Sequence, residues 1–206
     1  MKAGRKVGLG ALALLTLWGC ATARIAERRV LTGLLTDEAG SPVAKTPVLL
    51  VGRILDLNIR LQYQELRRKE LRTTTDEDGR YRFEFVPAEL GNHFVLFFYD
   101  REGFDSVKFQ KPDPLDVTKR LEKEAVVTID QILRPHPNWG EVERLIKTYG
   151  PDSDRGKILR RLGLPEKREA AGKIETWGYS SKGQSFRFSD GSLEGTFQFE
   201  PIQQPR

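Results

Sequence analysis

The hydrophobic and polar positions of this chain alternate with a period of two over several long stretches. Such alternation is typical of β-strands that bury one face. In the clearest stretch, residues 55–64, five apolar side chains alternate with five polar ones. A strand would place all the apolar side chains on one face, whereas a helix would scatter them around its circumference. The pattern therefore predicts a strand over 55–64.

Further strand patterns, separated by turn sequences, follow along the first two thirds of the chain. Clusters of Asp, Gly and Pro at 37–42 and of Asp and Gly at 76–79 predict turns. The run 94–99 is apolar throughout, which favours a strand buried on both faces. About six to eight strands with intervening turns predict an antiparallel β-sandwich. Besides 55–64 and 94–99, the expected strands lie at 30–36, 47–51, 80–85, 106–110 and 125–133.

The pattern changes to a helical period after residue 138. Asn138 is an expected N-cap, and Gly150 followed by Pro151 is a stop sequence. A second short helix is expected between Asp154 and Gly163. Three strands, at 175–179, 185–188 and 193–199, then alternate around hairpin turns. This order predicts a small α+β (ααβββ) domain.

Two prolines within 135–138 separate the halves, because proline continues neither a helix nor a central strand. We therefore predict a mainly β protein with two domains. The predicted parts are a signal segment at 1–20, a polar tether at 21–28, a β-sandwich at 29–134, a linker at 135–138 and an ααβββ domain at 139–202.

The first twenty residues have the layout of an export signal. Three basic residues precede an apolar stretch, 7–18, that is too short for a comfortable membrane span. The only cysteine, Cys20, follows directly after Gly19. This segment resembles a bacterial lipoprotein signal, although Trp18 stands where that family keeps a small residue. The resemblance implies cleavage before Cys20, whose thiol carries diacylglycerol through a thioether bond, with fatty acyl chains such as palmitate. The alternative is an ordinary secretory signal cut after Ala23.

The charge and the cysteine content of the chain exclude several classes of function. The chain has 34 basic and 29 acidic residues, and residues 1–20 hold three of the basic ones and no acidic one, so the remainder carries a net charge of +2. The remaining charges are mixed in sign, so we expect no nucleic-acid partner. After cleavage before Cys20, that cysteine is the only one left, and an internal disulfide, a thiol nucleophile in the folded part and a zinc–thiolate site are excluded.

The first domain contains a recognisable set of motif residues: Asp37, Gly40, Pro42, the run 74–83 and Gly103-Phe104. By these residues it resembles the carboxypeptidase regulatory-like (transthyretin-like) family. The match covers about 29–134 and implies a seven-stranded sandwich with a structural or binding role. The chain departs from the family by a longer stretch between Val51 and Thr73, which we interpret as an extra hairpin or edge strand and a candidate binding surface.

The second domain has its own set of motif residues: 162–165, Trp177, Tyr179, Phe186, Phe188 and 190–193. By these residues it resembles the BamE-like (SmpA/OmlA) family over about 139–200. That resemblance implies a small outer-membrane lipoprotein associated with β-barrel assembly, although the family usually places this domain directly after the lipid anchor. The aromatic members of the pattern are also expected as core and cross-strand pairs.

A search for catalytic groups identifies no candidate residue. The histidines, His93 and His136, are far apart in sequence, and there is no Gly-x-Ser-x-Gly or phosphate-loop motif. The run 76–79 matches the opening of a calcium loop, but Arg80–Phe83 follows at once, which favours a hairpin turn. We therefore predict no enzyme activity, no cofactor and no metal site, with Cys20 as the only site residue.

These observations predict an envelope lipoprotein that faces the periplasm and acts as a non-catalytic binding or structural module. Ala21, in place of the Asp that retains lipoproteins at the inner membrane, favours the outer membrane. The expected partners are the membrane, through the lipid on Cys20, and a protein of the envelope, for which strand pairing at a sheet edge is one expected mode of binding. The alternatives are an accessory factor in outer-membrane protein assembly and a cell-envelope hydrolase.

Overall fold

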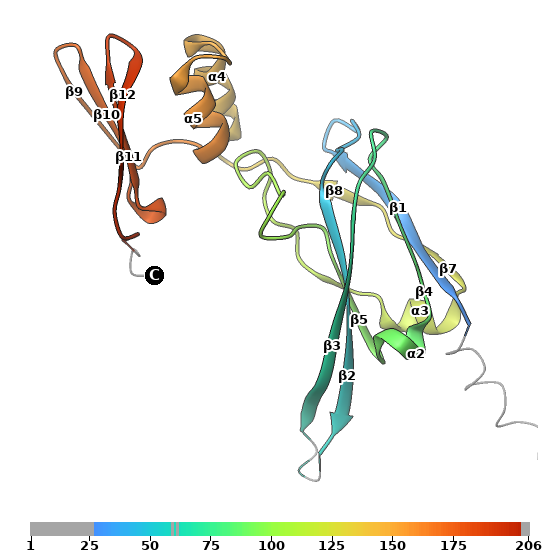
Figure 1. Ribbon diagram of the computed structural model, residues 1–206. Helices are drawn as coiled ribbons and strands as arrows, with labels where there is room; N and C mark the ends of the chain where they lie inside the picture. The colour runs from blue at the N-terminus through green and yellow to red at the C-terminus, as the bar shows by residue number, and fades with distance from the viewer. Residues whose placement is uncertain (1–26, 59, 61, 203–206) are drawn as a thin grey trace, which may run out of the picture. The chain divides into compact units, whose positions relative to one another are not determined.

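The computed structural model describes residues 27–58, 60 and 62–202 (Figure 1). The predicted signal segment, with Cys20, lies outside the described residues. Among those that are described, no helix is both long and apolar enough to cross a membrane. The chain is mainly β with predominantly antiparallel sheets, as predicted.

The chain divides into two compact units. Unit 1 takes in the residues up to 35, with 42–100 and 113–131, and unit 2 takes in 36–41, 101–112 and the residues from 132 onward. Segment 101–112, which lies within the range 29–134, thus packs with unit 2. The first ten elements are β1 (Arg29–Asp37), β2 (Pro47–Leu57), β3 (Tyr63–Thr74), β4 (Arg80–Phe85), α2 (Pro87–Leu90), β5 (His93–Phe97), β6 (Leu115–Asp116), α3 (Thr118–Lys123), β7 (Val126–Thr128) and β8 (Gln131–Leu133).

Two sheets enclose the core of unit 1. One has the order β4-β1-β7, with β8 also paired to β1, and the other has the order β3-β2-β5-β6. Alternate residues of β1 and β4 are buried, as the period of two predicts. Phe85 of β4 and Phe94 of β5 have ring centroids 6.1 Å apart, so the inner faces of the two sheets meet. The β1–β7 pair is parallel, and the other strand pairs whose register is known are antiparallel.

The prediction of one strand over 55–64 is wrong. β2 runs on to Leu57, the chain reverses, and β3 begins at Tyr63, so the alternating residues lie on both arms of a hairpin. Asn58 holds the reversal, because its side-chain Oδ1 accepts hydrogen bonds from the backbone N–H groups of Arg60 (2.9 Å) and Gln62 (3.0 Å). The stretch between Val51 and Thr73 is therefore an extended hairpin, and β3 is also an edge strand of its sheet.

Three other strand predictions differ from the structure. β5 is buried on one face only. Residues 106–110 form an isolated bridge between Phe109 and Pro135 rather than a strand. The expected strand 125–133 is interrupted, because the Ile129 N–H bonds to Thr32 O at 2.8 Å and the Leu34 N–H bonds to the Asp130 carboxylate at 2.8 Å. These bonds attach residues 129 and 130 to β1, so β7 and β8 are separate strands.

The run 76–79 forms a tight turn as predicted, but not a hairpin turn, because it connects β3 to β4 and these two strands belong to different sheets. The Asp76 carboxylate accepts hydrogen bonds from the N–H groups of Asp78 (3.0 Å) and Arg80 (2.8 Å). Gly79 has φ 74°, a left-handed conformation that glycine adopts without steric cost. A Cβ at this position would also lie 2.5 Å from the Leu35 carbonyl oxygen. The carboxylate at 76 is thus engaged in holding the backbone.

Unit 2 consists of two helices and a four-stranded sheet of order β12-β11-β10-β9. Its sheet is one strand larger than predicted, because 167–171, expected as a polar turn, pairs with β10. All five of these residues are exposed, so the strand has no alternating pattern in the sequence. The elements are α4 (Trp139–Tyr149), α5 (Asp154–Leu162), β9 (Lys167–Ala171), β10 (Ile174–Tyr179), a 3-10 turn (Ser180–Lys182), β11 (Gln184–Ser189) and β12 (Ser192–Gln198).

The aromatic residues of the second domain form its core, as the core interpretation predicts. Trp177, Tyr179, Phe186 and Phe188 are each at most 1 % exposed. They pack against the buried faces of α4 and α5. Asn138 makes no side-chain cap on α4, and α5 is capped by Ser153, whose Oγ accepts from the Gly156 N–H at 3.0 Å.

Candidate functional site

The β2–β3 hairpin extends beyond the rest of its sheet. β5 pairs with β2 only between Leu49 and Arg53, whereas β2 and β3 continue to pair with each other as far as Leu57 and Tyr63. We call this two-stranded part, residues 54–67, the β2–β3 arm (Figure 1). An isolated two-stranded hairpin is at best marginally stable in water. The arm therefore adds little to the core of unit 1.

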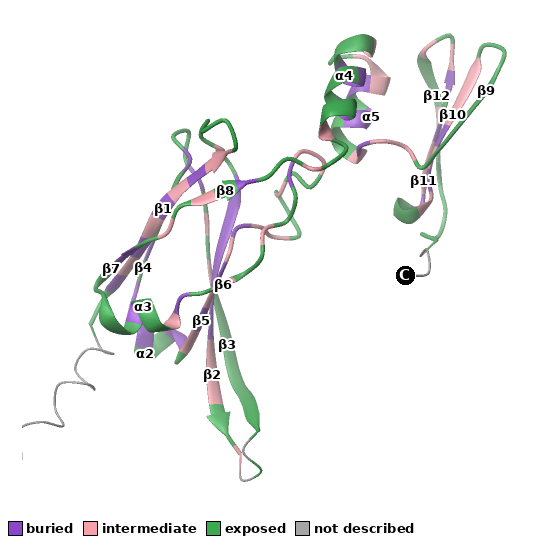
Figure 2. Cartoon of the chain, turned by 180° about the vertical axis from the view of Figure 1, so that it is seen from behind, coloured by how far each residue is buried: buried purple, intermediate pink, exposed green. Residues whose placement is uncertain are grey.

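The arm exposes large apolar side chains. Leu57 is 48 % exposed, Tyr63 is 78 % exposed and Leu66 is 58 % exposed. Every described residue of β3 from Tyr63 to Glu70 is exposed, as Figure 2 shows along this strand. Leu66 lies at an irregularity of the pairing, where Ile54 pairs with Arg67 but Leu55 pairs with Glu65. This surface is the most exposed apolar feature of unit 1 that the structure describes.

The base of the arm is firmly attached. The Asn92 side chain forms two hydrogen bonds with the backbone of Leu55, accepting from its N–H at 2.8 Å and donating to its carbonyl at 2.9 Å. The amide group of Asn92 thus takes the place of one further residue of β5 beside β2. The arm consequently begins from a fixed position, and its two strands continue without a third beyond Leu55.

Charged side chains line the outer edge of the sheet on β3. Hydrogen bonds from Arg72, and next from Arg68, hold the pKa of the Glu70 carboxyl below its usual range. Arg72 also pairs with Asp100, with 2.6 Å between nitrogen and oxygen. Charges of this kind hinder the addition of another strand to an edge. The part of β3 next to the arm is therefore protected against the addition of another strand.

A row of basic groups crosses the base of the arm but is compensated. Arg53 lies opposite both Arg68 on β3 and His93 on β5. Each has a carboxylate neighbour: Glu65 lies 3.4 Å from Arg53, Glu70 lies 2.7 Å from Arg68 and Asp116 lies 3.3 Å from His93. The row is thus an ion-pair network rather than an anion site.

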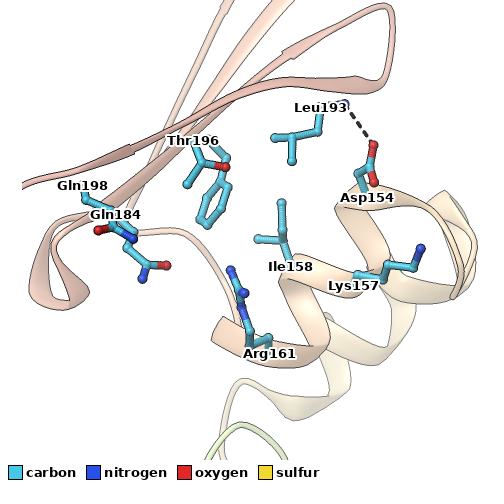
Figure 3. Close-up of a pocket in the computed structure, with 9 residues that line it drawn as sticks. Asp154, Lys157, Ile158, Arg161, Gln184, Leu193, Thr196 and Gln198 are labelled. Carbon is cyan, nitrogen blue, oxygen red and sulfur yellow. Dashed lines mark hydrogen bonds between the residues drawn. The ribbon is translucent and has the colours of Figure 1, made fainter.

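Unit 2 contains a groove of about 370 Å³ between α5 and the β11–β12 hairpin, shown in Figure 3. We call it the α5–β12 groove. Ile158 lines the helix side of the groove, and Phe186 of β11 lines the sheet side together with Thr196 and Gln198 of β12. At one end the Leu193 N–H donates to the Asp154 carboxylate at 3.0 Å, which fastens the start of β12 to the first turn of α5.

Two cations line the helix side of this groove. Lys157 and Arg161 are one turn apart on α5, and both are exposed. The Arg161 guanidinium lies 5.8 Å from the centroid of the Phe186 ring. Within residues 27–58, 60 and 62–202, neither cation forms an ion pair with a carboxylate. Their spacing of four within an expected helix is the signal in the sequence that places both on one side of α5.

A second, smaller cavity of about 190 Å³ is lined by His136, Glu166, Ser181 and Lys182. The Ser181 hydroxyl donates to Glu166, and this bond lowers the pKa of the Glu166 carboxyl. Lys182 donates to the Leu162 carbonyl at 2.7 Å, and burial lowers the pKa of its ammonium. A carboxyl with a lowered pKa is a weak general base. These groups fix the loop after β10 and do not form an activated nucleophile.

The structure also locates the other residues named in the sequence analysis. His93 belongs to β5 in unit 1, whereas His136 belongs to unit 2 and accepts from the Asn138 N–H through Nδ1 at 3.3 Å. Asp76 holds a turn, and Cys20 lies outside the described residues. In the part of the chain that is described, no group of three or more His, Cys, Asp or Glu side chains has the geometry of a metal site.

Comparison with known proteins identifies no family for this chain. No family model matches the sequence. No curated protein matches it either.

Several solved structures have a distant likeness to about half of the chain. The major pilin BcpA of Bacillus cereus has 13% identity over 53% of this chain and 30% of the pilin, with a TM-score of 0.33. The C-terminal domain of the shaft pilin SpaA of Lactobacillus rhamnosus GG has 9% identity over 53% of this chain and 99% of that domain, also with a TM-score of 0.33. The 3-chlorocatechol 1,2-dioxygenase of Rhodococcus opacus 1CP has 14% identity over 54% and 61%, with a TM-score of 0.30. Because these scores are low, we draw no argument from them.

Proposed function

We propose that this chain is a cell-envelope lipoprotein, held at the outer membrane by acyl chains on Cys20, that acts as a non-catalytic module binding a protein partner. The β2–β3 arm is the contact surface. We also propose that residues 29–134 are related to carboxypeptidase regulatory-like domains. Residues 139–202 are, on the same proposal, related to BamE-like domains. The observation that best supports it is the exposure of large apolar side chains on an arm that the core of unit 1 does not need.

The exposed side chains supply the energy for binding. Burying one large apolar side chain contributes about 1.5–3 kcal/mol. Leu57, Tyr63 and Leu66 are all substantially exposed, and the arm that carries them is fixed at its base by Asn92. A partner that covers the arm gains this burial without having to order the base of the hairpin first. Tyrosine, the residue type at position 63, is also enriched among interface hot spots.

The membrane attachment is tested by intact-mass measurement of the protein extracted in detergent. We expect a chain that begins at Cys20 and carries the added mass of acyl chains. Cys20→Ala should abolish both the added mass and the membrane association, because the Cys20 thiol is the group that forms the thioether bond to diacylglycerol. A chain that begins at Arg24, after cleavage behind Ala23, contradicts the anchor and makes the protein a soluble export product.

The arm is tested by photo-crosslinking in intact cells. With p-benzoylphenylalanine in place of Tyr63, which is 78 % exposed, we expect a discrete adduct with one envelope protein. The matched control carries the same group in place of Val126 of β7, which is 58 % exposed and distant in sequence from the arm. Leu57→Ser together with Leu66→Ser should reduce the Tyr63 adduct by about tenfold, since about 1.4 kcal/mol of lost burial corresponds to that factor.

The crosslinking experiment has clear contrary outcomes. Equal adducts from positions 63 and 126 would mean that the arm has no special partner. An adduct that persists at full yield in the double serine variant would mean that the apolar side chains do not drive binding. Far-UV circular dichroism of that variant should match the parent, because both substituted side chains are exposed.

A further inference from the structure

We propose that the α5–β12 groove binds an extended, acidic peptide segment of a partner protein, which adds to the sheet of unit 2 along β12. This inference goes beyond the arm, because every residue that it uses belongs to unit 2. Failure of the arm experiments therefore leaves it standing, and its own failure leaves the arm proposal untouched.

The first observation is that β12 is an unguarded sheet edge. In the sheet order β12-β11-β10-β9, the strands β12 and β9 form the two edges. β9 begins with the three charged residues Lys167, Arg168 and Glu169, whereas β12 contains a single charged residue, Glu194, which pairs with Arg187 at 2.9 Å. Charged side chains are a common protection of edges against strand addition. By this criterion β12 is the open edge and β9 the protected one.

The second observation concerns the side chains that alternate along β12. Leu193 and Thr196 lie opposite Phe188 and Phe186, so they face the groove. Phe197 lies opposite Ser185 on the other face and is 54 % exposed. A peptide strand beside β12 would direct alternate side chains to these two faces. One set would enter the groove, and the other would contact the Phe197 ring.

The third observation is the charge of the groove. Lys157 and Arg161 lie one turn apart on the same side of α5, and like charges at this spacing disfavour a helix. Asp154, the acidic residue of the lining, accepts the bond from the Leu193 N–H. The groove therefore has two cations without a carboxylate partner in the described part of the chain. Acidic side chains of a bound segment would supply the missing partners.

The fourth observation is an unsatisfied acceptor. The side-chain oxygen Oε1 of Gln184 is shielded from solvent and has no hydrogen-bond partner in the part of the chain that the structure describes. Gln184 lines the groove from β11, opposite Gln198 of β12. A buried acceptor without a donor costs about 1–3 kcal/mol. A backbone or side-chain N–H of a bound peptide can satisfy it.

The experiment uses the full chain and two short fluorescein-labelled peptides, one of alternating Glu and Val and one of alternating Lys and Val. In fluorescence anisotropy we expect the Glu/Val peptide to bind and the Lys/Val peptide to bind about tenfold more weakly or not at all. Lys157→Glu with Arg161→Glu should weaken binding of the Glu/Val peptide by about tenfold or more and strengthen that of the Lys/Val peptide. The matched control, Arg144→Glu with Lys147→Glu on α4, has the same charge change and should leave both affinities near those of the parent.

Hydrogen exchange locates the peptide. We expect the Glu/Val peptide to slow amide exchange at Gly195–Gln198 and not at Lys167–Ala171. Absence of binding, or equal effects of the two double variants, would overturn the charge argument, and binding without protection of β12 would overturn strand addition. If vesicles of phosphatidylglycerol bind with the same dependence on Lys157 and Arg161 while the peptide does not, the groove recognises lipid headgroups and the proposal is wrong.

Discussion

Trp177→Ala is expected to destabilise unit 2 by about 3–5 kcal/mol, the usual range for removing a large buried aromatic side chain. The Trp177 side chain is fully buried, and its ring lies 4.9 Å from that of Phe188 and 5.9 Å from that of Tyr149, between centroids. Its Nε1–H also donates to Glu175 at 2.7 Å, and Glu175 pairs in turn with the partly buried Arg155. The substitution therefore creates a cavity and removes one hydrogen bond from Glu175.

Urea denaturation followed by the fluorescence of Trp139 measures this loss, because Trp139 packs against the same core and remains in the variant. Trp177→Phe is the matched control. It keeps most of the apolar volume but loses the N–H donor, and we expect a loss of about 1–2 kcal/mol. If Trp177→Ala costs less than about 1 kcal/mol, the ring is not the centre of this core.

Gly33→Ala is expected to destabilise unit 1 by about 3 kcal/mol, at the upper end for a small-to-large change in a packed site. A Cβ on Gly33 would lie 1.8 Å from the carbonyl oxygen of Ile129. That carbonyl has little freedom to move, because it accepts from the Tyr81 hydroxyl at 2.7 Å and the Ile129 N–H bonds to Thr32. β1 is also held, since it pairs with β4 on one side and β7 on the other.

Urea denaturation followed by far-UV circular dichroism measures the effect. Gly140→Ala is the matched control, because a Cβ at position 140 meets nothing within 4 Å and the residue lies in the first turn of α4. We expect it to be neutral or to stabilise the chain by up to about 1 kcal/mol. Tyr81→Phe removes only the hydrogen bond to the Ile129 carbonyl and should lower the free energy of unfolding by about 1 kcal/mol. Equal stability of the two alanine variants would show that the backbone yields at residue 33.

Much of the fold follows from local pattern. The alternation in β1, β4 and β11 predicts which side chains are buried, because a strand with one covered face has a period of two. The Asp190-Gly191 turn also follows from its residues: both adopt positive φ, 48° and 89°, in the hairpin between β11 and β12. The aromatic residues of the second domain were correctly expected in its core.

The prediction failed where the period of two has more than one structural meaning. A single strand and a hairpin can show the same alternation over 55–64, and the hydrogen bonds of the Asn58 side chain decide for the hairpin. The strand β9 was not predicted, for the opposite reason. All its side chains are exposed, so its backbone pairing with β10, rather than any apolar pattern, makes it a strand.

The candidate surfaces depend still more on tertiary structure. The α5–β12 groove combines Lys157 and Arg161 of α5 with Gln184 of β11 and Thr196 of β12, and these residues belong to separate elements. The sequence reveals that they are polar. Only the packing of α5 against the sheet shows that they line one cavity.

The sequence by itself determined the alternation of β1, β4 and β11, the positions of α4 and α5, the turns at 76–79 and 190–191 and the chemistry available to the chain, because steric preference and amphipathicity act over a few neighbouring residues. The tertiary structure alone decided which strands are edges, where the β2–β3 arm leaves its sheet and which cations lack a carboxylate partner in the described residues. These properties arise from hydrogen bonding and packing between residues far apart in the chain. Such pairings leave no local pattern in the sequence.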